Sequence, residues 1–124
     1  MSVVSSVVVG VNAVFFAGMG LRALAAPAEM LRPFGITLGE AASRAEVRAV
    51  YGGFGLAIAA VLGYAIAAPE QVRTGIVLTV SVALLGMAFG RVVSAVAGDR
   101  TSFYPNWFYG LVEVLLAASL WWAG

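Results

Sequence analysis

The amino-acid sequence predicts an all-α protein, a bundle of four transmembrane helices that forms a single domain over residues 1–124. Two observations carry this prediction. Hydrophobic residues make up 62% of the chain and charged residues only 10%, whereas soluble domains carry about 25% charged residues. The chain also divides into four long apolar stretches, and none shows the two-residue alternation of a membrane β-strand. Because helices satisfy their own backbone hydrogen bonds in lipid, four helical spans follow.

The predicted spans cover about residues 3–26, 47–68, 74–97 and 104–123. Each is close to the ~20 helical residues that cross about 30 Å of hydrocarbon. A cleaved signal peptide is the alternative for the first stretch, because small residues surround a cleavage point in "ALAAPA". That stretch begins without arginine or lysine, and it exceeds the roughly 7–15 apolar residues of a signal core. We therefore expect it to remain as a helix.

Arginine is the only basic residue type, and its distribution predicts an orientation. One arginine, Arg73, lies on the side of the second loop. The other six lie on the side of the first and third loops: Arg22, Arg32, Arg44, Arg48, Arg91 and Arg100. By the positive-inside rule, the first and third loops face the cytoplasm and both termini face outward.

Composition excludes several classes of function. A net charge of +1 provides no basic surface for nucleic acid. The chain contains no cysteine and no histidine, so we predict no thiol chemistry, no metal site and no cofactor site. General acid–base catalysis usually needs a histidine or two placed carboxylates, and Glu113 is the only carboxylate well inside a span. We therefore expect that the protein is not an enzyme.

Two charged side chains lie inside predicted spans, Arg91 in the third and Glu113 in the fourth. If these spans form an antiparallel hairpin, the depths of the two residues differ by about 3 Å. A charge at mid-bilayer costs about 2.5–3.5 kcal/mol, so we expect the two to pair. Arg22, Arg48 and Tyr51 approach from the same side. Together the five residues form a predicted intramembrane polar cluster.

This cluster has two interpretations. In one, the Arg91–Glu113 pair fixes the helix order while Arg22 and Arg48 extend to the lipid headgroups. In the other, the surplus positive charge binds an anionic headgroup or an acidic group of a partner, in a cavity that opens to the cytoplasm. The long first loop is expected to lie on the membrane surface or to meet a partner.

Small residues predict where helices pack closely. Gly86 and Gly90 form a GxxxG pair in the third span, and Gly52 and Gly53 lie in the second span, where Gly55, Ala59, Gly63 and Ala67 follow at four-residue spacing. Such residues let helix backbones approach, and packing within the bundle is favoured over a dimerisation face. Internal similarity also predicts two similar hairpins in parallel arrangement, the alternative being chance similarity among glycine, alanine and leucine. "GMGLR" at 18–22 matches "GMAFGR" at 86–91, and "YGGFGLAIAA" at 51–60 matches "YGLVEVLLAA" at 109–118.

Three motifs carry a family resemblance: "EVRAVYGGFGLAIA" at 46–59, "GRVVSAVAGD" at 90–99 and "EVLLA" at 113–117. Together they resemble the bacterial four-helix membrane family known as domain of unknown function 4345, over nearly the whole chain. The matching positions are Arg48, Tyr51, Gly52, Gly53, Gly90, Arg91 and Glu113. The resemblance implies a small membrane bundle with no established reaction. A looser similarity to the DoxX-like membrane proteins implies a role beside redox or lipid-handling complexes.

The function we expect is that of an accessory or scaffold subunit of a larger assembly in the bacterial inner (plasma) membrane. Its expected partners are membrane lipid and either a membrane protein or further copies of the chain. The alternative is a binder or carrier of an anionic lipid, a quinone or another amphipathic molecule in the arginine-rich intramembrane pocket.

Overall fold

The computed structural model describes all 124 residues and contains helices but no strand, which confirms the predicted all-α class. Two segments, η2 and η3, are π-helical, and η1 is a single 3-10 turn. In chain order the elements are α1 (Val3–Ala25), α2 (Pro27–Leu31), η1 (Arg32–Phe34), α3 (Ala41–Val47), η2 (Arg48–Gly53), α4 (Phe54–Ala67), α5 (Glu70–Val96), η3 (Phe103–Trp107) and α6 (Phe108–Ala123).

Three helical stretches are long and apolar enough to cross a membrane: α1, the continuous helix Ala41–Ala67, and α5. The sequence predicts a fourth, but α6 has 16 residues, or about 24 Å at 1.5 Å per residue, less than the ~30 Å hydrocarbon core. Only 22 of the 124 residues are buried, and large apolar side chains cover the outer surface. This surface is consistent with a protein that faces lipid.

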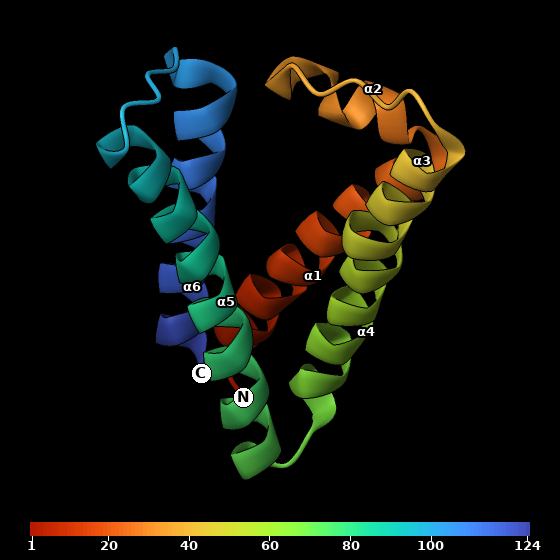
Figure 1. Cartoon of the computed structure of the whole chain (residues 1–124). Coiled ribbons are helices and arrows are strands. Elements are labelled where there is room, and N and C mark those ends of the chain that lie inside the picture. Colours follow the sequence, from red (N-terminus) through yellow and green to blue (C-terminus); the bar gives the residue numbers. More distant parts are fainter.

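The helices form two antiparallel pairs that together make a V (Figure 1). In the first arm α1 packs along α4, and in the second α5 packs along α6. The arms meet at the end that holds both chain termini and the turn from α4 to α5, which we call the narrow end. They separate at the wide end, where α2 and α3 lie. The two arms correspond to the two hairpins predicted from internal similarity.

Two helices begin earlier than the sequence predicts. The helix that contains α4 begins at Ala41 rather than near residue 47, and α5 begins at Glu70 rather than near residue 74. Both added segments are rich in alanine, glutamate, arginine or glutamine, which favour helix but are too polar or too weakly apolar to extend a hydrophobic stretch. In α5, Glu70 also lies in the first turn, where a negative charge interacts favourably with the helix dipole. Hydropathy therefore marks the lipid-facing length rather than the helix length.

The main hydrophobic core lies where the two arms meet. Its central side chains, Val9, Leu62, Leu84 and Leu120, are fully buried and come from all four long helices. A second, smaller core lies at the wide end, where Ala23, Leu31 and Val47 join the end of α1 to α2 and α3. Each fully buried side chain of this kind contributes about 1.5–3 kcal/mol where water is the alternative environment, and less where lipid is.

Backbone contact at glycines holds the first arm together. A Cβ at Gly20 would lie 2.8 Å from the Gly52 carbonyl oxygen and 2.9 Å from the Leu56 nitrogen. A Cβ at Gly55 would lie 3.0 Å from the Phe16 carbonyl oxygen. Because these neighbours are backbone atoms, a larger residue at either glycine would force α1 and α4 apart.

The other glycines predicted to pack helices do so less than expected. A Cβ at Gly53 would meet only the carbonyl oxygen of its own helix, at 3.9 Å, and none at Gly63, Gly86 or Gly90 would meet any atom within 4 Å. Gly63 has no such neighbour although it follows Gly55 at four-residue spacing. The reason is that each four-residue step rotates the position by about 40° around the helix, away from the contact at Gly55. Gly86 and Gly90 lie on the side of α5 opposite its buried face, so the expectation that they pack within the bundle is wrong.

Candidate functional site

The second arm carries an ion pair near its wide end. The Arg91 Nε donates to Glu113 Oε1 and the Arg91 Nη2 donates to Glu113 Oε2, both at 2.8 Å. The Nη1 donates to Asn106 Oδ1 at 3.2 Å. The Glu113 side chain is 3% exposed and the Arg91 side chain 20% exposed. This two-pronged contact is the strongest geometry available to arginine and carboxylate, and it joins α5 to α6.

The elements around the pair shape its surroundings. Gly110 lies one turn before Glu113, and a Cβ there would approach the Arg91 Cδ to 3.3 Å, so the glycine leaves room for the arginine stem. The Phe34 ring, from η1 of the first loop, has its centroid 6.0 Å from the Arg91 guanidinium carbon. Its centroid is also 5.5 Å from that of Tyr109 in α6. The first loop therefore reaches across the wide end to the second arm.

The other three residues of the predicted cluster form no hydrogen bond and no ion pair with Arg91 or Glu113. Arg22 lies in the last turn of α1, is exposed, and forms no ion pair or hydrogen bond. Arg48 is also exposed, and its Nε donates to the Leu24 carbonyl oxygen at 3.0 Å, which satisfies a free carbonyl at the end of α1. Tyr51, in η2, is half-buried and forms no hydrogen bond. The structure thus brings two of the five residues together and leaves Arg22 uncompensated.

The spacing of buried residues in the two arms explains why Arg22 stays apart from the Arg91–Glu113 pair. Buried residues recur at seven-residue spacing in both arms, as Val9, Phe16 and Ala23 in α1, Val77 and Leu84 in α5, Gly55 and Leu62 in α4, and Glu113 and Leu120 in α6. The half-buried Arg91 lies seven residues after Leu84 and so takes the place in α5 that Ala23 takes in α1. The charged pair of the second arm therefore occupies positions that hold alanine and glycine in the first. The sequence comparison matched Arg22 with Arg91, whereas burial matches Ala23 with Arg91. Arg22 consequently points to a different side of its helix.

Sequence reasoning missed an uncharged polar group in the middle of the bundle. Asn12 is 1% exposed, and its Nδ2 donates to the Val8 carbonyl oxygen at 3.0 Å and to Ser119 Oγ at 3.1 Å. Its Oδ1 has no partner. Nearby in the core, Ser81 Oγ donates to the Ala117 carbonyl oxygen at 2.9 Å. The sequence does contain a signal for this group, since Asn12 is an amide inside an apolar stretch. Polar side chains within membrane spans usually form hydrogen bonds to another helix.

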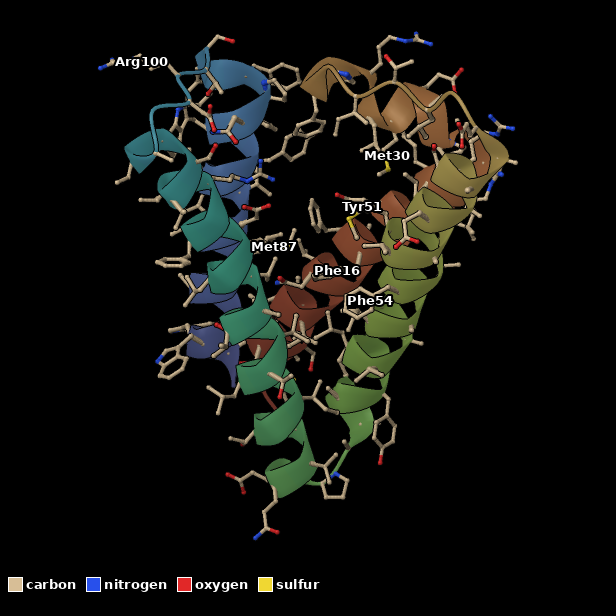
Figure 2. All side chains as sticks on the ribbon, viewed as in Figure 1. Phe16, Met30, Tyr51, Phe54, Met87 and Arg100 are labelled. Atoms are coloured by element: carbon tan, nitrogen blue, oxygen red, sulfur yellow. The ribbon has the colours of Figure 1, made fainter.

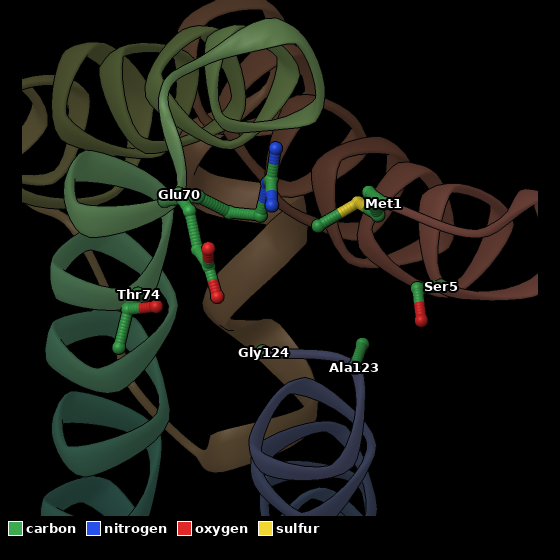
Figure 3. Close-up of a pocket in the computed structure, with 7 residues that line it drawn as sticks. Met1, Ser5, Glu70, Thr74, Ala123 and Gly124 are labelled. Carbon is green, nitrogen blue, oxygen red and sulfur yellow. The ribbon is translucent and has the colours of Figure 1, made fainter.

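A pocket with a volume of about 390 Å³ lies at the narrow end, remote from the ion pair (Figure 3). It is lined by Met1, Ser5, Glu70, Arg73, Thr74, Ala123 and Gly124. The Arg73 side chain donates to the carbonyl oxygens of Ala65 and Ala68, at 3.2 and 2.9 Å, and so caps the end of α4. No group of three or more histidine, cysteine, aspartate or glutamate side chains is placed to hold a metal ion.

One family profile, Domain of unknown function (DUF4345), matches residues 4–123. The chain belongs to this family. No curated protein and no solved structure matches it. Among the residues on which the DUF4345 resemblance rests, Arg91 and Glu113 form the ion pair, Gly52 of η2 lies against Leu24 of α1, and Arg48 caps α1. These residues of the DUF4345 chain thus connect helices to each other.

Proposed function

We propose that this DUF4345 chain is a four-span protein of the bacterial inner membrane that acts as an accessory or scaffold subunit of a larger membrane assembly. In this arrangement α1, the helix Ala41–Ala67, α5 and the combined η3–α6 stretch each cross once. The wide end, which carries six of the seven arginines, faces the cytoplasm, and both termini face outward. Arg73, the exception at the narrow end, is engaged in capping α4.

The outer face of α5 is the observation that carries the proposal. Gly75, Gly86 and Gly90 are exposed there, on the side opposite the buried Val77 and Leu84, and a Cβ at any of the three would meet no atom within 4 Å. In lipid, helices associate through close packing rather than the hydrophobic effect, and glycine permits the closest approach. The helix of another subunit would gain contacts on this face that lipid chains do not provide.

Two internal features agree with a supporting role. The two charges buried within the bundle neutralise each other, so no charged group is left over in the core for chemistry. The segments outside the long helices are short, and the longest of them, between α1 and α3, folds back over the wide end through Phe34. The chain therefore offers mainly its lateral surface to other molecules.

The test is to fill the outer face of α5 and to measure assembly. Gly86→Leu and Gly90→Leu should remove a defined higher-mass species from gently solubilised membranes while the chain stays folded. Gly18→Leu is the matched control, because Gly18 is exposed on α1 and a Cβ there also meets no atom within 4 Å. Loss of the species in all three variants, or a wild-type chain that migrates alone under every gentle condition, would contradict the proposal.

A second candidate function is binding or transport of an amphipathic molecule, such as an anionic lipid or a quinone. The unpaired guanidinium of Arg22, at the wide end, is the observation that favours it. Mass spectrometry of material extracted from the purified protein tests this function. A stoichiometric lipid or quinone would support it, and the absence of any bound amphiphile would refute it.

A further inference from the structure

We propose that the two arms of the V pivot about the narrow end, and that the first loop is a strap which closes the wide end through Phe34. The strap consists of residues 27–40, which include α2 and η1. When Phe34 leaves its contacts with the second arm, the wide end opens while each arm stays intact. This motion requires neither of the two proposed functions.

Each arm is held together by close contacts between its own two helices. In the first arm, α1 and the helix that contains α4 meet backbone to backbone at Gly20 and Gly55. In the second arm, the two-pronged contact between Arg91 and Glu113 joins α5 to α6, and Ser81 of α5 donates a hydrogen bond to a carbonyl oxygen of α6. Helices fastened in this way move together as one body.

The bonds that connect one arm to the other lie at the narrow end and in the core. Because α4 ends at Ala67 and α5 begins at Glu70, two residues form the only covalent link between the arms. Arg73 of α5 fastens this link by donating hydrogen bonds to two carbonyl oxygens at the end of α4. In the core, Asn12 of α1 donates to Ser119 of α6 at 3.1 Å. A short link between two helix ends is a common form of hinge.

The wide end lacks such bonds between the arms. No hydrogen bond and no ion pair joins the first arm or the strap to the second arm there. Below the strap, Figure 2 shows Tyr51 of the first arm and Met87 of the second. Met87 is exposed, so the first arm does not cover it. The arms are therefore held less firmly at the wide end than at the narrow end.

The strap joins the two arms through one aromatic ring. It is fixed to the first arm by Leu31, which is buried in the smaller core at the wide end, and Phe34 packs against the same core. From there the strap reaches toward the second arm (Figure 1). The centroid of the Phe34 ring lies 5.5 Å from that of Tyr109 and 6.0 Å from the Arg91 guanidinium carbon. Such ring contacts are modest in strength, so breaking them leaves both cores in place.

The test measures the distance between the arms in the full chain, in nanodiscs, by pulsed electron spin resonance. The chain contains no cysteine, so two spin labels can be placed at Ala45→Cys in α3 and Val96→Cys at the end of α5, both exposed at the wide end. We expect one main distance with Phe34 in place. In Phe34→Ala the ratio of a longer distance to the main one should rise about tenfold, because the contacts with Tyr109 and Arg91 are lost. Phe34→Tyr keeps the ring and should stay close to the wild type.

Two further variants separate the strap contact from general loosening. Leu38→Ala is the matched control, because Leu38 also packs against the smaller core but carries no ring. It should change the ratio by less than about twofold. Tyr109→Leu removes the ring contact from the other side, so it should also raise the ratio. The double variant of Phe34→Ala and Tyr109→Leu should match Phe34→Ala alone, because the two residues share one contact.

Three results would overturn the proposal. A wild-type distance distribution in both Phe34→Ala and Tyr109→Leu would mean that the ring contact does not hold the wide end closed. Equal changes in Phe34→Ala and Leu38→Ala would mean that the whole strap had loosened. A second pair of labels, at Val82→Cys in α5 and Leu115→Cys in α6, should keep one distance in every variant. A new distance for that pair would show that the second arm comes apart rather than pivoting.

Discussion

Replacing Glu113 with glutamine tests the role of the ion pair in stability. The Glu113 side chain is 3% exposed and accepts two hydrogen bonds of 2.8 Å from Arg91. Glutamine has nearly the same shape, so the substitution removes the charge without opening a cavity. It leaves the Arg91 guanidinium with the Asn106 oxygen and one amide oxygen as acceptors, but without a counter-charge.

The expected cost of Glu113→Gln follows from that geometry. Removing one partner of a buried ion pair destabilises a protein by about 3–5 kcal/mol. The low end applies, because the Arg91 side chain remains 20% exposed and can shift toward the membrane interface. The hydrogen bond retained by the glutamine oxygen returns about 1 kcal/mol. We therefore expect the free energy of unfolding to fall by about 2 kcal/mol.

A double-mutant cycle measures the coupling. The free energy of unfolding would be determined by denaturant titration in mixed micelles for Glu113→Gln, Arg91→Gln and the double variant. The double variant buries two amides and no charge, so its loss should be smaller than the sum of the single losses by about 2 kcal/mol. Arg32 and Glu29 provide the control, because this pair is 3.8 Å apart with side chains 75% and 50% exposed. Its coupling should stay below about 0.5 kcal/mol.

Additive losses for Arg91 and Glu113, within about 0.5 kcal/mol, would refute the reasoning. So would a coupling no larger than that of the exposed control pair, because both outcomes mean that the contact does not hold α5 to α6.

Three further substitutions test other contacts. Gly20→Ala should lower the free energy of unfolding by about 1–3 kcal/mol, because its Cβ would press on the backbone of α4, whereas Gly10→Ala, whose Cβ meets nothing within 4 Å, should be neutral in the same titration. Ser81→Ala should cost about 0.6 kcal/mol through loss of its hydrogen bond across to α6, and no measurable loss would show that this bond is replaced. Arg73→Ala should cost about 1 kcal/mol and increase amide exchange at the end of α4, and unchanged exchange there would contradict its capping role.

The sequence predicted the all-α class and the contact between Arg91 and Glu113, because both follow from strong physical costs. Unpaired backbone groups and unpaired charges are so unfavourable in lipid that few arrangements avoid them. The hydrogen bond from Arg91 to Asn106 was not predictable in the same way. Asn106 lies in the π-helical η3, and Phe34 reaches the site from a distant loop, so neither position follows from periodicity.

Helix packing was predicted less well than charge pairing. Glycine spacing shows that a helix has a smooth face but not which neighbour meets it, so Gly86 and Gly90 were assigned to the bundle although they lie outside it. The register between the two arms also differs from the one that similar letters give. Similar letters place Arg22 opposite Arg91, whereas the seven-residue spacing of the buried residues places Ala23 opposite the half-buried Arg91, one residue and about 100° away on the helix.

Single-cysteine labelling tests most directly whether the chain crosses the membrane four times with its wide end in the cytoplasm. The chain contains no cysteine, so each introduced thiol reports one position. Thr101→Cys, in the exposed turn between α5 and η3, should react with an impermeant reagent only from the cytoplasmic side. A cysteine appended after Gly124 should react only from the outer side. Labelling of both positions from the same side would show that η3–α6 does not cross the membrane and would contradict the account.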